Sequence, residues 1–125
     1  MKQVLIVFIG GGLGTVMRFL TSKIIPYSGK GFPWSTFSAN MIGCLIIGVI
    51  TGYFLRNISE NQSEWILFAT IGFCGGFTTF SSFANENFLL LREDNYIIML
   101  IYSILSVLSG ILMIYLGIML ERYFH

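Results

Sequence analysis

The sequence contains little charge, a single histidine and two cysteines. Charged residues make up 10% of the 125 positions and hydrophobic residues 55%, whereas soluble globular chains carry roughly 25% charge. The sequence has no His cluster with metal-ligand spacing, no glycine-rich phosphate loop and no nucleophile triad. The composition therefore argues against a soluble enzyme or a nucleic-acid-binding protein, and it indicates an integral membrane protein.

Several long segments carry no charge, and their lengths indicate which parts of the chain cross the membrane. Residues 31–55, 65–85 and 95–120 carry no charged side chain, and each reaches the roughly 20 residues that a helix needs to cross the hydrocarbon core. A fourth apolar segment runs from about Val4 to Ile25 and ends before Pro26, which cannot continue the helix. The sequence predicts an all-α membrane protein with four transmembrane helices.

The connections between these helices are short. They comprise about residues 26–33, 56–64 and 92–95, and none is long enough to hold a soluble domain. We therefore expect residues 1–125 to form a single transmembrane domain. Any function must be carried out by groups inside the membrane.

Basic residues are almost evenly divided between the two predicted sides of the membrane. One side carries Lys2, Arg56 and Arg122, and the other carries Lys23, Lys30 and Arg92, with Arg18 added if its side chain reaches that interface. Such a balance removes the bias that normally fixes orientation, so the chain is expected to insert both ways up. Copies inserted both ways can form an antiparallel homodimer. An accidental balance in a chain with few charges is the alternative.

Two candidate functional residues, Arg18 and Asn40, lie inside the first two predicted helices. Arg18 either extends to the interface or points into a water-filled vestibule that attracts anions. Asn40 offers N–H donors to an anion, or it bonds a neighbouring backbone and holds helices together. Gly10 and Gly14 have the small-xxx-small spacing that lets two helices approach closely, and we interpret them as packing residues.

The last predicted helix carries a polar face. Tyr102, Ser106, Ser109 and Gly110 share it at i, i+4, i+7 and i+8 spacing. Hydroxyls in a row can form a track along which an ion exchanges water for protein hydrogen bonds. Serines bonded to their own helix backbone are the alternative.

The stretch GFCGGFTTFSSF, residues 72–83, interrupts the third apolar segment with glycines and hydroxyls. Gly75-Gly76 suggests a discontinuous helix, because irregular backbone at membrane depth is tolerated where protein or a water-filled cavity surrounds it. Carbonyls freed at the end of the first half-helix could coordinate a cation. Thr78 and Thr79 are placed to cap the second half-helix.

Two aromatic residues follow the predicted break. Phe80 and Phe83 lie at i, i+3 spacing on one face. Such a pair usually belongs to a core, but the edge of an aromatic ring carries partial positive charge and can face an anion.

These motifs together resemble the CrcB or Fluc fluoride channels. The resemblance rests on GFCGGFTTFSSF, on SANMIG around Asn40, and on GGGLGTVMRF, which ends in Arg18 and Phe19. It covers nearly the whole chain. It implies a non-enzymatic, passive exporter of fluoride, built as an antiparallel dual-topology dimer with a structural sodium ion at its centre and placed in the bacterial plasma membrane.

The resemblance also implies roles for individual residues. The fluoride pathway would comprise Asn40, Phe80, Phe83, Ser82, Tyr102 and Ser106. Gly75 and Thr78 would give main-chain carbonyls to the sodium ion, and Arg18 would lie in a basic vestibule. Ser82 stands where the family motif commonly has threonine, and the hydroxyl is retained. Glu86 lies at about the depth of Arg18, and the two side chains are expected to pair or to flank the vestibule.

Two other classes share some of these features. A four-helix dual-topology multidrug transporter is the main alternative, but such an antiporter needs an intramembrane carboxylate, and no Asp or Glu occurs before Glu60. A noncatalytic assembly subunit, whose glycines only pack helices, is the second.

Overall fold

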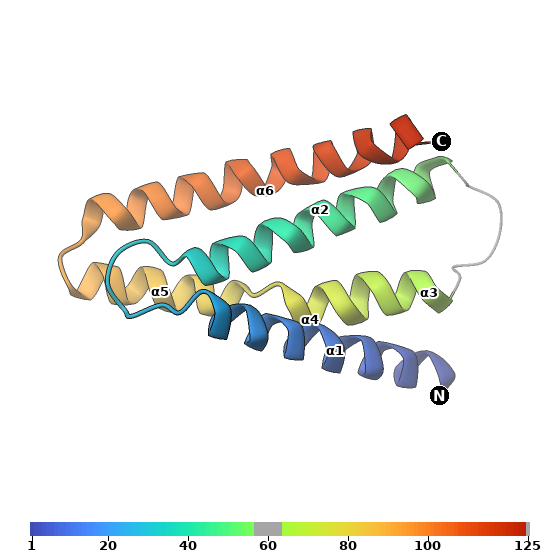
Figure 1. Cartoon of the computed structure of the whole chain (residues 1–125), viewed down its shortest axis with the longest axis horizontal. Coiled ribbons are helices and arrows are strands. Elements are labelled where there is room, and N and C mark those ends of the chain that lie inside the picture. The colour runs from blue at the N-terminus through green and yellow to red at the C-terminus, as the bar shows by residue number, and fades with distance from the viewer. Residues whose placement is uncertain (57–63, 125) are drawn as a thin grey trace.

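The chain folds into long helices that run side by side (Figure 1). The computed structural model describes residues 1–56 and 64–124. Within these residues, four helical segments are long and apolar enough to cross a membrane. Three of them are α1 (Lys2–Ile24), α2 (Trp34–Arg56) and α6 (Tyr96–Phe124). The prediction of four such helices is confirmed. The predicted connection at residues 56–64 lies almost wholly outside the described residues.

The third segment, residues 64–92, is built from several pieces. They are α3 (Glu64–Leu67), the π-helical turn η1 (Phe68–Cys74), α4 (Gly75–Phe77) and α5 (Phe80–Arg92). Thr78 and Thr79 separate α4 from α5 with extended backbone, at φ −78°, ψ 156° and φ −150°, ψ 115°. The helical hydrogen-bond ladder is therefore interrupted between the two.

The glycine pair does not form this interruption. Gly75 has helical dihedrals, φ −62° and ψ −35°, and Gly75–Phe77 is helical. The prediction that Gly75-Gly76 breaks the helix is therefore wrong, and the extended residues follow three positions later. The reason is packing: a Cβ at Gly76 would lie 3.1 Å from the Gly11 Cα of α1, so Gly76 allows close contact between helices.

Glycines also bring α1 against η1 and α4. A Cβ on Gly10 would lie 3.0 Å from the Gly72 Cα, and one on Gly14 would lie 2.8 Å from the Phe77 nitrogen. The first distance is tighter than nine in ten real Cβ contacts, and the second is shorter than real Cβ atoms show. The interpretation of Gly10 and Gly14 as a close-packing pair is confirmed.

A second glycine-mediated contact joins α2 to α6. A Cβ on Gly117 would lie 2.7 Å from the Val49 nitrogen, and one on Gly48 would lie 2.9 Å from the Ile114 Cα. The two helices run along each other for most of their length in Figure 1. The third segment lies between this pair and α1 in that view.

Both chain termini lie at one end of the molecule, together with α3 (Figure 1). Two ion pairs are found there, Lys2 Nζ to Glu64 Oε1 at 2.7 Å and Arg56 Nη1 to Glu121 Oε1 at 3.9 Å. The connections from α1 to α2 and from α5 to α6 lie at the opposite end. Most of the large apolar side chains on α1 and α6 are exposed, as expected for surfaces that contact lipid or another subunit.

Candidate functional site: two cavities that meet at Thr79

The interruption after α4 is held in place by Asn40 of α2. The Thr79 N–H donates to Asn40 Oδ1 at 2.8 Å, and Asn40 Nδ2 donates to the Thr79 carbonyl at 3.3 Å. One amide side chain thus replaces both helical partners of a residue whose backbone has left the helix. Asn40 therefore braces the backbone, which is one of the two roles expected for it, and retains a second N–H.

Thr79 is the N-cap of α5. Its Oγ1 accepts from the Ser82 N–H at 3.2 Å and donates to Ser82 Oγ at 3.1 Å. The prediction of a threonine cap is confirmed for Thr79. Thr78 instead donates its hydroxyl to the Cys74 carbonyl at 2.8 Å, within the preceding helix.

Two main-chain carbonyls lose their usual helical donors at this point. The Thr79 N–H would donate to the Gly75 carbonyl in a continuous helix, but it donates to Asn40. The Ser82 N–H would likewise donate to the Thr78 carbonyl, but it donates to Thr79 Oγ1. Carbonyl oxygens released in this way are suitable ligands for a hard cation.

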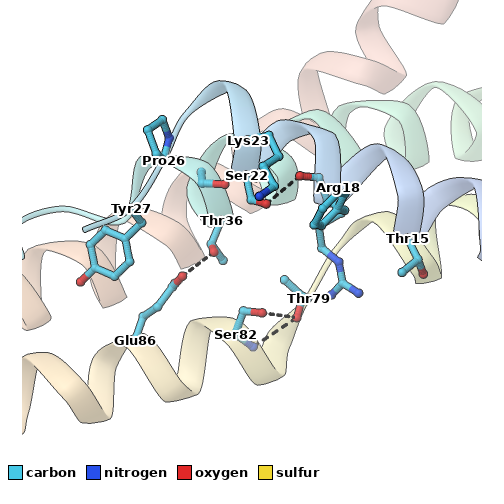
Figure 2. Close-up of a pocket in the computed structure, with 12 residues that line it drawn as sticks. Thr15, Arg18, Ser22, Lys23, Pro26, Tyr27, Thr36, Thr79, Ser82 and Glu86 are labelled. Carbon is cyan, nitrogen blue, oxygen red and sulfur yellow. Dashed lines mark hydrogen bonds between the residues drawn. The ribbon is translucent and has the colours of Figure 1, made fainter. Parts of the chain in front are cut away.

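Thr79 lines a cavity of about 610 Å³, which we call the vestibule cavity. Figure 2 shows most of the residues that line it. They come from α1, α2, α5 and the connection after α1: Thr15, Arg18, Phe19, Ser22, Lys23, Pro26, Tyr27, Ser35, Thr36, Thr79, Ser82 and Glu86. The cavity can hold a hydrated ion, because its walls offer hydroxyls and charged groups.

Glu86 is held in the vestibule cavity by two hydroxyl donors. Thr36 Oγ1 donates to Glu86 Oε1 at 2.6 Å, and the Tyr102 hydroxyl donates to Oε2 at 2.8 Å. Arg18 lines the same cavity, and Figure 2 shows it on the opposite side, near Thr79. Of the two arrangements expected for Arg18 and Glu86, they flank the cavity, and no ion pair joins them among the described residues.

The connection after α1 contributes Tyr27 to the vestibule wall. The backbone of this connection turns at Gly29 and Gly31, both at φ 80°, a conformation that glycine adopts without strain. Burial, and then the nearby carboxylate of Glu86, raise the pKa of the Tyr27 hydroxyl. The hydroxyl therefore stays protonated near neutral pH and remains a hydrogen-bond donor.

Thr79 also lines a second, less polar cavity of about 300 Å³, which we call the aromatic cavity. Its lining consists of Asn40, Met41, Cys44, Ile47, Thr78, Thr79, Phe80, Phe83, Ser106 and Val107. The Phe80 and Phe83 ring centroids are 5.8 Å apart. The Ser106 Oγ is buried without a hydrogen-bond partner among the described residues, so it remains available to an ion or water.

The structure brings together most, but not all, of the predicted pathway residues. Asn40, Phe80, Phe83 and Ser106 all line the aromatic cavity. Ser82 lies in the vestibule cavity instead, because its hydroxyl turns toward the Thr79 cap. Tyr102 lines neither cavity; it is 0% exposed, its ring lies 5.0 Å from that of Phe83, and its hydroxyl bonds Glu86.

The sequence analysis did not assign Thr36 to this site, and it gave Thr79 a capping role only. Thr36 holds Glu86, and Thr79 lines both cavities. Thr36 precedes Asn40 by one helical turn, so its position on the same polar face of α2 could have identified it. The place of Thr79 in the cavity walls depends on where the helix is interrupted, and the sequence analysis predicted that interruption at Gly75-Gly76.

Comparison with known proteins identifies relatives over the full length. Residues 5–118 match the family described as "CrcB-like protein, Camphor Resistance (CrcB)". The chain belongs to the CrcB family. A relative from Phocaeicola vulgatus, named "Fluoride-specific ion channel FluC", is 45% identical over 98% of this chain and 100% of its own. Relatives of the same name from Azobacteroides pseudotrichonymphae and Pyrococcus abyssi are each 40% identical, over 99% and 98% of both chains respectively.

Proposed function

We propose that this member of the CrcB family is a fluoride-specific channel that exports fluoride passively. The observation that carries the proposal is the pair of cavities that share Thr79 as a lining residue, because most of the predicted pathway residues line them. The full-length relatives named as fluoride-specific channels support it. Hydrogen fluoride enters cells as a neutral acid and dissociates inside, and a channel lets the membrane potential drive the anion out. No catalytic step is needed.

In the proposed pathway, fluoride leaves bulk water in the vestibule cavity and is dehydrated near Thr79. Arg18 attracts the anion into the vestibule. The second N–H of Asn40, the Ser106 hydroxyl and the ring edges of Phe80 and Phe83 then replace its water in the aromatic cavity. Tyr102 and Ser82 act from outside that cavity, by holding Glu86 and the α5 cap.

The proposed assembly is an antiparallel homodimer of dual topology. Phe80 supports it, because this residue is 79% exposed although it lines the aromatic cavity. A partner subunit would complete the wall that a single chain leaves open. The near-equal number of basic residues on the two sides is the second argument.

A structural sodium ion at the dimer centre is part of the proposal. The Gly75 and Thr78 carbonyls fit it, because the donors that would satisfy them in a helix bond Asn40 and Thr79 instead. Two such carbonyls from each of two chains would supply oxygen ligands of the kind that hard cations prefer. We further propose that the interruption lies at the middle of the bilayer, in the bacterial plasma membrane.

The competing function is proton-coupled multidrug transport, and the comparisons give it no support. The test is release of fluoride from vesicles that contain the purified protein, followed with a fluoride electrode. A channel releases fluoride when valinomycin and potassium balance the charge and no proton gradient is imposed. Release that requires a proton gradient, or none above protein-free vesicles, would reject the channel.

A further inference from the structure

The vestibule cavity carries a second cation besides Arg18. Lys23 also lines it, in the last turn of α1. Arg18 lies five residues earlier, which places it about 7.5 Å deeper along the helix axis. Figure 2 shows both side chains on α1, with Arg18 nearer to Thr79. The two positive charges therefore lie at different depths of one cavity.

The structure holds the Lys23 ammonium at the wall of the cavity. Its Nζ lies 5.3 Å from the centroid of the Phe19 ring, and Phe19 lines the same cavity. A cation over an aromatic face is attracted by the ring quadrupole. The carboxyl end of α1 also favours a positive charge at this position. These contacts limit the freedom of a side chain that is otherwise exposed.

The acidic side chain of the vestibule does not cancel these cations by direct pairing. Among the described lining residues the carboxylate is Glu86, and each of its oxygens accepts a hydroxyl hydrogen bond, at 2.6 and 2.8 Å. The ion pairs formed by the described residues involve neither Arg18 nor Lys23. The lining therefore has a formal charge of one positive unit, with both cations facing the cavity.

We propose that Lys23 is an outer electrostatic guide that raises the rate at which anions reach Arg18. This inference rests on the proposed fluoride channel. Lys23 touches the ion only in its hydrated state, so its charge attracts fluoride and chloride alike. It therefore changes the rate of arrival and leaves the selectivity between the two ions unchanged.

The test is fluoride release at low ionic strength by Lys23→Gln and Lys23→Glu, at the lowest fluoride concentration that an electrode resolves. A unit charge acting through water over about 8 Å changes a rate by about twofold. We expect Lys23→Gln to lower the initial rate about twofold and the charge reversal Lys23→Glu about fourfold. In about 1 M potassium gluconate, where the screening length falls to roughly 3 Å, both variants should match the parent protein.

Two further variants separate charge from structure. Lys23→Arg keeps the charge and should retain the parent rate. Lys30→Gln removes a charge from the same end of the molecule, outside the lining of the cavity, and should also retain it. An equal loss at all salt concentrations, no loss at low salt, or an equal loss in Lys30→Gln would overturn the role of Lys23. A parent protein that releases no fluoride would instead reject the proposed function.

Discussion

At the scale of single residues, the rings of Phe80 and Phe83 test whether the aromatic cavity conducts. If they only fill space, exchange for isoleucine changes volume and shape alone. If their edges contact fluoride, the exchange removes the partial positive charge that the rings present. We expect Phe80→Ile and Phe83→Ile each to lower fluoride release at least about tenfold, or roughly 1.4 kcal/mol on the barrier, in protein that remains folded.

Phe88→Ile is the matched control for this pair. Phe88 lies on the same helix, is 58% exposed, and lines neither cavity. Its replacement should leave release at the parent rate. If the Phe80 and Phe83 variants also release fluoride at the parent rate and are as stable as the parent protein, both rings only pack.

Asn40 is the second residue-scale test. In Asn40→Asp, the carboxylate still accepts from the Thr79 N–H but faces the Thr79 carbonyl without a proton to donate. It also places a negative charge beside the proposed anion path. At an effective dielectric of about 20, repulsion at about 4 Å reaches roughly 4 kcal/mol, so fluoride release should fall more than about a hundredfold.

Asn87→Asp controls for the structural part of that change. Asn87 donates to the Phe83 carbonyl at 2.9 Å and accepts from the Ser103 hydroxyl at 2.9 Å. The same substitution therefore removes one donated bond and keeps one accepted bond, as at Asn40, but outside the two cavities. We expect a folded protein that still conducts. If both variants lose fluoride release equally, Asn40 only braces the backbone and does not contact the anion.

At the scale of the helices, the glycines of α1 set how closely it approaches the third segment. A Cβ in Gly14→Ala would lie 2.8 Å from the Phe77 nitrogen, whereas one in Gly12→Ala meets no atom within 4 Å. Backbone atoms cannot yield without separating the helices, so Gly14→Ala should lower the free energy of unfolding by at least about 2 kcal/mol. Gly12→Ala should raise it by up to about 1 kcal/mol.

Thermal unfolding of the two purified variants in one detergent measures this difference. Equal melting temperatures would contradict the close contact of α1 with α4 and η1. The comparison is direct, because both changes add one methyl group to the same helix.

Hydropathy predicted the helices well and the interruption poorly, for separate physical reasons. An uncharged segment of spanning length has few stable arrangements other than a helix in a bilayer, so all four were located. Glycine, by contrast, serves both to break helices and to let them approach. Gly76 does the second, because Gly11 packs against it, and the break needs Asn40 from another helix to replace the lost backbone bonds.

The site, too, was predictable from the sequence in part. The motif around Phe80 and Phe83 indicated which residues would come together in the aromatic cavity. The hydrogen bonds from Thr36 and Tyr102 to Glu86 join residues 50 and 16 positions apart, and no local pattern fixes such pairs. Three-dimensional packing was needed to find them.

At the scale of the whole molecule, the balance of basic residues makes orientation the property to test. Two lysines added after Phe124 would favour one orientation, because positive charge resists translocation. We expect such a chain to lose most of its fluoride release when it is expressed alone. Release should return when a copy with lysines added near Lys30 is expressed with it. Full activity from either uniformly oriented chain alone would contradict the antiparallel dimer.

The proposed function requires that the two cavities form a path selective for fluoride. The most direct measurement compares the release of fluoride and of chloride from the same vesicles, with valinomycin present and each ion followed by its own electrode. We expect fluoride to leave rapidly, while chloride is retained as well as in protein-free vesicles. Release of both ions at similar rates, or retention of both, would contradict it.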